Sequence, residues 1–124
     1  MKNLNIRVWH RPERRWMAEG SDEMIRAIIN RDNPAGINLA IDASDRYGSE
    51  IYVDDIVNVL PDHYDKYLID SNPWVIKKHG ASYVLLKRLN AMGDITAREL
   101  PNTYFLEVIG NIYENPELLD GEGK

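Results

Sequence analysis

Apolar residues recur at every second position in several short runs of the chain, which is the period of a β-strand with one buried face. The first such run is LNIRVW, in which Leu4, Ile6 and Val8 share one side. The charged HRPERR that follows contains a proline and predicts a turn, and Trp16 begins a return segment. Residues 4–18 are therefore predicted to form a β-hairpin.

The segment GSDEMIRAIINRDNPAG has the clearest helical pattern. Ser21 can accept a hydrogen bond from the exposed amides of a helix start, and the acidic residues after it suit the positive end of the helix dipole. Pro34 and Gly36 end the predicted helix. Its apolar face is predicted to consist of Met24, Ile25, Ile28 and Ile29.

Two further runs predict strands in the middle of the chain. INLAI alternates, and its Ile37, Leu39 and Ile41 are predicted to share one side. In the polar DASDRYGSE that follows, Gly48 can adopt a positive φ at no steric cost. IYVDDIVNVL is again strand-like, but its alternation slips in the middle. A sharp turn or a bulge is therefore predicted at Asp54 and Asp55.

Residues 62–113 contain short apolar runs whose periodicity alone does not separate strand from helix. KYLID and NPWVIKKHG are predicted to be extended, and DITAREL a short helical turn that ends before Pro101. Residues 82–92 fit either a strand or a helix capped by Ser82, and their Tyr and Val favour the strand. TYFLEVIGNIY predicts a strand at 103–113 with apolar contacts on both faces.

The C-terminal VIGNIYENPELL keeps much apolar surface where chains commonly fray. Gly110 is predicted to allow a bend or a close approach in a last strand. Asn115 is predicted to cap a final helical turn that starts at Pro116. Leu118 and Leu119 are predicted to plug an open end of the core or to dock on a neighbouring subunit. Burying both leucines would contribute about 3 to 6 kcal/mol.

These elements predict a mainly β, α+β fold. It consists of an antiparallel SH3-like or barrel-like sheet with one helix in the N-terminal half and a short C-terminal helical turn. A length of 124 residues suits one domain, here 1–119, followed by a disordered tail at 120–124. The absence of cysteine excludes thiolate metal sites and thiol catalysis. Neither a signal peptide nor a membrane span is visible, so we expect a cytoplasmic protein.

Cationic and aromatic residues interleave in the chain, although its net charge is −5. The basic stretches, residues 1–15 and 77–98, form either one positive face that attracts phosphates or solvated strand edges and turns. Interleaving of this kind is typical of single-strand nucleic-acid platforms, and equally of a β core or an oligomer interface. The candidate interaction surface consists of Arg7, Trp9, Arg15, Trp16, Trp74 and Lys77.

Paired carboxylates are the first candidates for acid–base chemistry or cation binding. Asp54 and Asp55 are adjacent, and Glu107 and Glu114 are their potential partners. Adjacent strand residues point to opposite faces, however, so the two aspartates converge only if a bulge turns them. We therefore expect Asp55 to accept hydrogen bonds from turn amides instead.

The remaining polar motifs point to no specific chemistry. His10 and His79 each lie next to basic residues, which disfavours a bound cation, and His63 lies in PDHYDKY, a common surface-turn composition. The chain has no G-x-S-x-G elbow and no glycine-rich phosphate loop. We therefore assign no catalytic, cofactor-binding or metal-binding residues.

Three segments resemble the YopX family of small phage and prophage proteins: IRVWHRPERRWM, DRYGSEIYVDDIVNV and FLEVIGNIYENPELL. Family members commonly carry glycine where this chain has Asp54, so either the turn differs here or strain is held at that residue. The resemblance implies a mainly β, SH3-like domain, a tendency to form oligomers and a phage or prophage origin, but no established activity. The middle segment keeps the family pattern Asp45, Gly48, Ile51, Tyr52, Asp55, Ile56 and Val57.

From these observations we expect a non-enzymatic accessory protein that acts as a protein-interaction module in the host cytoplasm. We expect it to form a homo-oligomer and to bind a phage or host protein. The alternative is a nucleic-acid-binding module that uses the basic strands and the tryptophans, which the acidic net charge disfavours. A hydrolase that uses Asp54, Asp55 or Glu107 is the third hypothesis.

Overall fold

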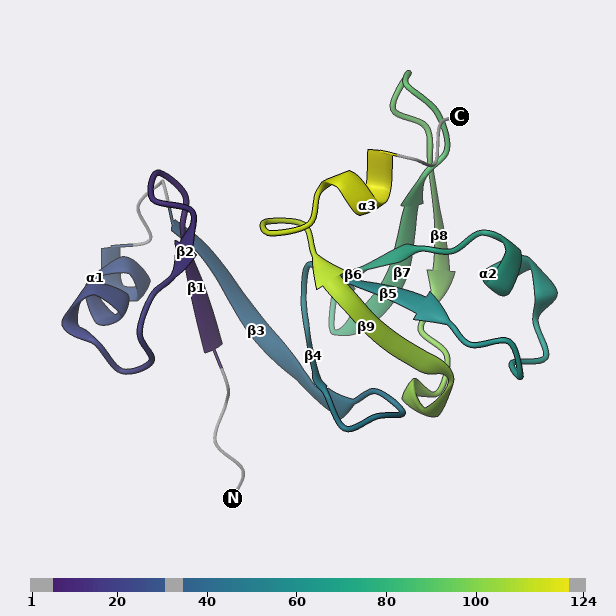
Figure 1. Cartoon of the computed structure of the whole chain (residues 1–124), viewed down its shortest axis with the longest axis horizontal. Helices are drawn as coiled ribbons and strands as arrows, with labels where there is room; N and C mark the ends of the chain where they lie inside the picture. Colours follow the sequence, from purple (N-terminus) through teal and green to yellow (C-terminus); the bar gives the residue numbers. More distant parts are fainter. Residues whose placement is uncertain (1–5, 31–34, 121–124) are drawn as a thin grey trace. The chain divides into compact units, whose positions relative to one another are not determined.

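A computed structural model describes residues 6–30 and 35–120 of the chain. It is mainly β, with two antiparallel sheets, one of them a half-barrel, and short helices, which confirms the predicted fold class (Figure 1). Contacts divide the chain into two compact units, Met1–Ala40 and Ile41–Lys124, and each is described by itself. A single domain over 1–119 stays a prediction, and residues 121–124 of the predicted tail lie outside the described residues.

The N-terminal unit is built on the predicted hairpin. β1 (Ile6–His10) pairs antiparallel with β2 (Arg15–Trp16) on one side and with β3 (Ala35–Ser44) on the other. The hairpin is thereby confirmed for its described residues, whereas Leu4 lies outside them. In this unit Val8, Met17 and Met24 form a small buried cluster.

The predicted helix is α1 (Asp22–Asn30), and its cap is confirmed because Ser21 Oγ accepts a hydrogen bond from Met24 N at 3.1 Å. The predicted apolar face is too wide, however. Met24 is buried, but Ile25 and Ile29 are 46% and 73% exposed. Only the stripe that includes Met24 and Ile28 meets the cluster, since a nine-residue helix on a small sheet buries one narrow face.

β3 confirms the predicted strand over INLAI, but its buried side is the opposite one within this unit. Ile37 and Leu39 are 37% and 39% exposed, whereas Asn38 and Ala40 are buried. Asn38 tolerates burial because its Oδ1 accepts a hydrogen bond from Arg7 Nε at 3.2 Å. The alternation therefore identified the strand but not the side that faces the interior.

The C-terminal unit is dominated by a five-stranded antiparallel sheet in the order β8-β7-β6-β5-β9 (Figure 1). β8 and β9 are its two edges, so the half-barrel stays open. The strands are β5 (Asp55–Val59), β6 (Trp74–His79), β7 (Ser82–Arg88), β8 (Ile95–Glu99) and β9 (Leu106–Asn111). The shorter elements are β4 (Glu50–Tyr52), α2 (Lys66–Asp70), a 3-10 turn (Thr103–Phe105) and α3 (Glu117–Asp120).

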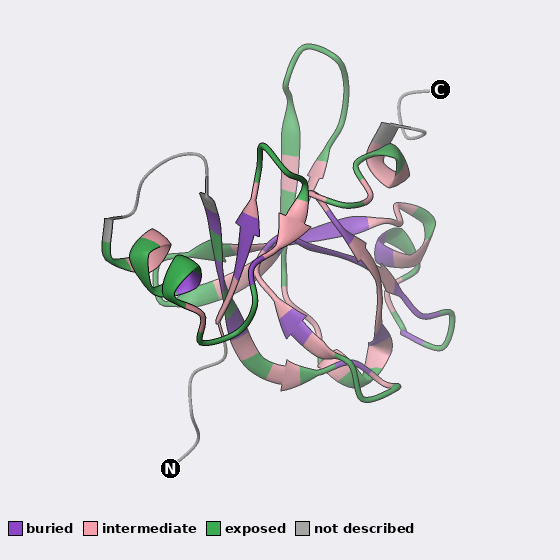
Figure 2. Cartoon of the chain, turned by 60° about the vertical axis from the view of Figure 1, so that its left-hand side comes forward, coloured by how far each residue is buried: buried purple, intermediate pink, exposed green. Residues whose placement is uncertain are grey.

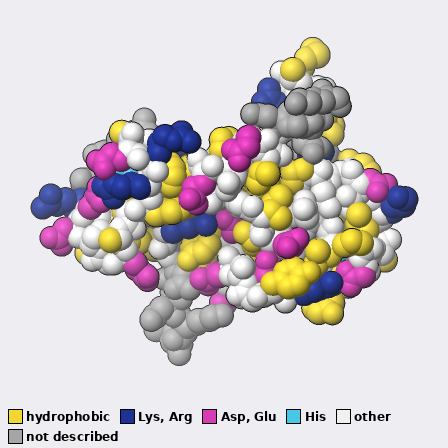
Figure 3. Space-filling view, viewed as in Figure 1, with side chains coloured by type: hydrophobic (Ala, Val, Ile, Leu, Met, Phe, Trp, Pro, Cys, Tyr) yellow, Lys and Arg dark blue, Asp and Glu magenta, His cyan; other side chains and the backbone are white. Residues whose placement is uncertain are grey.

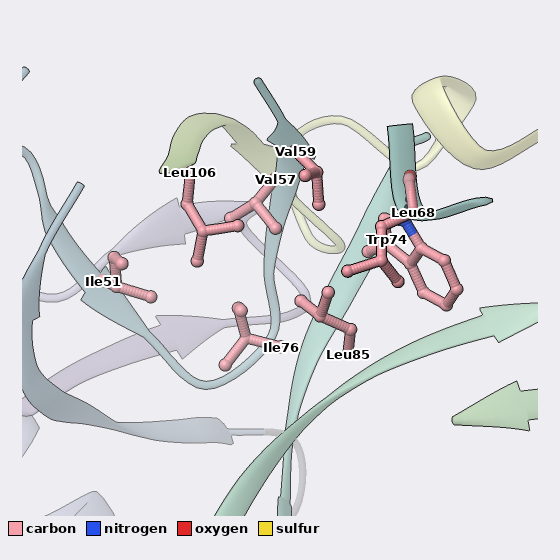
Figure 4. Packing of buried hydrophobic residues seen from close by; sticks show 8 residues of the cluster. All are labelled: Ile51, Val57, Val59, Leu68, Trp74, Ile76, Leu85 and Leu106. Atoms are coloured by element: carbon pink, nitrogen blue, oxygen red, sulfur yellow. Dashed lines mark hydrogen bonds between the residues drawn. The ribbon is translucent and has the colours of Figure 1, made fainter. Parts of the chain in front are cut away.

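The core of this unit lies on the inner face of the sheet, and Figure 2 shows that burial is concentrated on the strands. Trp74 is fully buried, and its indole Nε1 donates to Leu68 O at 2.9 Å, which satisfies its polar group. The buried side chains come from four strands of the sheet, from β4 and from α2: Ile51, Val57, Val59, Leu68, Trp74, Ile76, Leu85 and Leu106 (Figure 4).

Several predicted elements of this unit are confirmed and two are wrong. NPWVIKKHG contains strand β6, residues 82–92 contain strand β7, and a turn separates β4 from β5 at Asp54. KYLID is helix α2, because Asp65 Oδ1 caps Tyr67 N at 3.0 Å and only Leu68 is buried. DITAREL is strand β8, since a turn ending at Gly93, with φ of +95°, returns the chain alongside β7.

The C-terminal segment folds back on β9 through a contact between Gly110 and Asn115. A Cβ atom added at Gly110 would lie 2.5 Å from Asn115 Oδ1, which confirms the predicted close approach at this glycine. The group that approaches Gly110 is the Asn115 side chain. Asn115 Oδ1 accepts a hydrogen bond from Asn111 N at 3.3 Å, turned back toward β9. The Asn115 side chain therefore does not cap the final helical turn as predicted. The turn begins instead with the main-chain bond from Leu118 N to Asn115 O, at 3.0 Å.

The two terminal leucines do not plug the core. Leu118 and Leu119 are only partly buried, and neither belongs to the core cluster. Leu119 instead lines a groove on the outer face of β6 and β7. The apolar ending therefore covers the outside of the sheet.

The Gly110–Asn115 contact predicts the effect of a substitution. Gly110→Ala should lower the free energy of unfolding by about 1–3 kcal/mol, because the added methyl group overlaps a side chain held between β9 and α3. The measurement is urea denaturation, with a lower midpoint at an unchanged slope. Combining Gly110→Ala with Asn115→Gly should recover part of the loss, and an equal loss in the single and double variants would contradict the contact.

Candidate functional site

Asp54 connects three parts of the C-terminal unit. Its Oδ1 accepts a hydrogen bond from Lys77 Nζ at 2.6 Å and its Oδ2 accepts one from Tyr113 OH at 2.7 Å. Its backbone N–H donates to Ile76 O at 2.8 Å, and its carbonyl accepts from Ile112 N at 3.1 Å. The β4–β5 turn is thereby attached both to β6 and to the segment after β9.

The backbone of Asp54 has a φ of +75°, a region that costs free energy for any residue with a Cβ atom. The sequence allowed either a different turn or strain held at Asp54. The structure confirms the strain, because the turn keeps a glycine-like conformation with aspartate in it. The bonds to Lys77 and Tyr113 offset this cost, because hydrogen bonds to an ionised group contribute about 1.5–3 kcal/mol each.

Asp55 has the role predicted for it. Its side chain is buried, and Oδ2 accepts a hydrogen bond from Tyr52 N at 2.8 Å across the turn. A carboxylate that accepts main-chain amides in this way fixes the geometry of a tight turn.

Asp45 does the same in the loop between β3 and β4. Its Oδ1 accepts hydrogen bonds from Tyr47 N and Ser49 N, both at 2.9 Å, and Gly48 has the predicted positive φ, at +90°. Its Oδ2 accepts from Val108 N at 2.8 Å, which attaches the loop to the outer edge of β9. A sequence signal for this role exists, because aspartate three residues before a turn glycine is a common loop pattern.

The acidic residues thus act as structural acceptors. Glu114 Oε1 accepts from Asn111 Nδ2 at 2.9 Å, and Glu107 is half-buried on β9 opposite Asn58. In residues 6–30 and 35–120, no group of three or more histidine and acidic side chains is arranged to hold a metal ion. Asp45, Asp54 and Asp55 thus hold turns in place through these hydrogen bonds.

Four of the six predicted surface residues lie in the N-terminal hairpin. Trp9 is only 5% exposed and packs edge-to-face on Trp16, with ring centroids 4.9 Å apart. The guanidinium of Arg7 lies 4.5 Å from the Trp16 ring centroid. Arg15 forms ion pairs with Glu13 and Glu23 at 2.8 and 2.7 Å, and its hydrogen bond lowers the pKa of Glu13. In the hairpin, Arg7 therefore lies over the Trp16 ring, and Arg15 is paired with two carboxylates.

The other two residues lie in the C-terminal unit. Trp74 belongs to the hydrophobic core, which corrects its assignment to an interaction surface, because the indole packs under α2 and cannot stack on a base. Lys77 is paired with the buried Asp54. Of these two residues, Lys77 reaches the surface as part of an ion pair, and Trp74 does not reach it.

Two of the three histidines make local contacts. His63 is buried, stacks on Tyr64 with centroids 4.5 Å apart and accepts a hydrogen bond from Asp65 N through Nδ1 at 3.0 Å. His10 Nδ1 accepts from Glu13 N at 3.1 Å.

Arg46 crosses from its own loop to the turn after β5. It binds both carboxylate oxygens of Asp62, at 2.7 and 2.9 Å, and this hydrogen bond lowers the pKa of Asp62. Its guanidinium also lies 4.1 Å from the Tyr104 ring centroid. These contacts hold two surface loops together at an exposed site, where an ion pair contributes little to stability.

Two surface features were missed from the sequence. The first is the β7–β8 hairpin, whose tip exposes Leu89, Met92 and Ile95 at 51%, 90% and 57%. Figure 3 shows hydrophobic atoms at the top of the view, where this hairpin projects in Figure 1. The second is the groove that Leu119 lines. The turn composition of NAMGD was a signal for the hairpin, whereas no local pattern indicates the groove.

Comparison with known proteins identifies one family. The model of the family described as YopX protein matches residues 41–120, which is more than half of the chain and falls within the C-terminal unit. The first of the three resembling segments, IRVWHRPERRWM, lies outside this match. No match was found among curated proteins. No helix within the described residues is long and apolar enough to cross a membrane.

Substitution of Asp54 separates the strain from the hydrogen bonds. Asp54→Ala loses the bonds to Lys77 and Tyr113 and keeps the strained φ, whereas Asp54→Gly loses the same bonds but relieves the strain. Asp54→Ala should therefore destabilise the protein by about 1 kcal/mol more than Asp54→Gly, measured by urea denaturation.

Tyr113→Phe is the matched control, because it removes one hydroxyl donor and leaves the turn backbone unchanged. Loss of this bond should lower the free energy of unfolding by about 1.5–3 kcal/mol. Equal stabilities of the alanine and glycine variants would show that no strain is held at Asp54.

Proposed function

Since the chain belongs to the YopX protein family, we propose for it the role of a non-enzymatic protein-interaction module that assembles with copies of itself. The observation that carries this proposal is the unpaired outer edge of β8. The carboxylates that would otherwise suggest catalysis are engaged in turns, which supports a role in binding. A phage or prophage origin and a host or phage partner remain expectations from the family resemblance.

The orientation of β8 follows from its pairing with β7. Leu89 N donates to Asp94 O at 2.7 Å, so the hydrogen-bonded pairs of this hairpin are Lys87 with Thr96 and Leu85 with Arg98. The main-chain groups of the alternate residues therefore point away from β7: Ile95, Ala97 and Glu99. No described residue pairs with that edge.

The opposite edge of the same sheet is covered. There the Asp45 carboxylate accepts from Val108 N, and Arg46 N donates to Leu106 O at 3.0 Å. An exposed edge strand is a template for pairing with another chain, and proteins commonly block such edges. Blocking β9 while β8 stays open favours β8 as the edge used for assembly.

The sequence of β8 suits antiparallel pairing with its own copy. A twofold axis at Ala97, a small residue at the centre, places Ile95 opposite Glu99 of the second copy. In this arrangement the two hairpin ends, which carry the exposed Leu89 and Met92, lie at opposite ends of the paired strands. The backbone hydrogen bonds between the two β8 strands would therefore carry the association.

Sedimentation velocity tests this proposal. The chain should shift from monomer to dimer or larger species as its concentration rises through the micromolar range. Ile95→Glu should move the equilibrium toward monomer at least tenfold, since it places a carboxylate directly opposite Glu99 of the second copy. Ala97→Pro should do the same by removing an outward N–H that the hairpin does not use.

Ile29→Glu is the matched control, because it places the same charge on an exposed isoleucine of α1 in the other unit. It should leave association unchanged, and urea midpoints should show that all variants fold. A wild-type chain that stays monomeric throughout, or equal disruption by Ile29→Glu and Ile95→Glu, would reject assembly through β8.

A further inference from the structure

The groove on the outer face of the sheet has an apolar floor. It encloses about 320 Å³ between β6, β7 and the segment after β9. Val75 and Leu86 are direct cross-strand partners, and Ile112 and Leu119 form the facing wall. Its volume lies at the lower end of the range of small-molecule sites, roughly 300–1,000 Å³.

The rim of the groove is cationic, although the chain as a whole is acidic. Lys77, Lys87 and Arg88 line it, and none of the described side chains that line it is acidic. Lys77 is bound to Asp54, whereas Arg88 donates only to the carbonyls of Asn90 and Ala91, at 3.1 and 3.3 Å. The charge of Arg88 therefore has no carboxylate partner among the described residues.

We propose that this groove binds a small amphipathic anion, a molecule with an apolar body and one carboxylate. The body lies on Val75, Leu86 and Ile112, against Leu119, and the carboxylate meets Arg88 and Lys87 at the rim. Apolar surface binds without direction, while a charged pair at the edge fixes orientation, and this division is typical of ligand sites.

A small ligand fits better than an extended peptide. Peptides that bind along sheets gain affinity from main-chain hydrogen bonds to a free strand edge. The two strands under the groove have none, because β6 lies between β5 and β7, and β7 lies between β6 and β8. An occupant of this groove must therefore be held by apolar contact and charge alone.

Octanoate, below its micelle concentration, is the probe. Titrating it into the full chain should give saturable amide shifts in nuclear magnetic resonance spectra at Val75, Leu86, Ile112 and Leu119. The double variant Lys87→Gln plus Arg88→Gln should weaken octanoate binding about tenfold. Octanol has the same apolar body without the charge, so its affinity should be the same for the wild type and for the double variant. That affinity should be about as weak as the affinity of the double variant for octanoate.

Arg98→Gln is the matched control, since Arg98 is an exposed arginine on the neighbouring strand outside the groove, and it should leave the octanoate affinity unchanged. Leu119→Asn should weaken octanoate and octanol alike. The proposal is overturned if octanoate causes no saturable shifts, if octanol binds the wild type as tightly as octanoate, or if Arg98→Gln is as harmful as the double variant. Tighter binding of a short Asp-Leu-Leu-Asp peptide would also overturn it and assign the groove to a protein partner.

Discussion

The buried Asp54 carboxylate is the constraint on which the C-terminal unit depends. The β4–β5 turn needs a backbone conformation that glycine adopts freely, yet the chain has aspartate there. The strain is tolerated because the same side chain reaches Lys77 on β6 and Tyr113 beyond β9. One residue therefore joins a turn, a central strand and the C-terminal segment, which lie far apart in the sequence.

The same physical device recurs at the other turns of this unit. Asp45 and Asp55 are buried carboxylates whose oxygens accept main-chain amides, and each fixes a loop against a strand. A buried carboxylate without donors would be very costly, so these residues belong to the loops that supply the donors. This explains why acids that stand out in the sequence as candidates for catalysis are used instead to shape the sheet.

The sequence predicted those parts of the fold that depend on local pattern. Alternation identified β1 and β3, strand propensity and apolar runs identified β6 and β9, and the phase slip at Asp54 identified a turn. The strand predicted over 103–113 is shorter in the structure, because Thr103–Phe105 form a 3-10 turn before β9. It failed where short runs are ambiguous: KYLID is helical because of a cap at Asp65, and DITAREL is a strand because a turn pairs it with β7. Trp74 and the groove at Leu119 were beyond prediction, because which side of a strand faces the core is decided by tertiary packing.

The C-terminal segment shows how the surface follows from these constraints. The Gly110–Asn115 contact and the bond from Ile112 N to Asp54 O turn the chain back after β9. Leu119 then lies over the outer face of β6 and β7, since the inner face is already filled by Trp74, Ile76 and Leu85. Apolar residues that have no place in the core line a groove with a cationic rim. Among the described residues, the sheet is thus covered at β9, open at β8 and hollowed on its outer face, and the last two features are the surfaces we propose for binding.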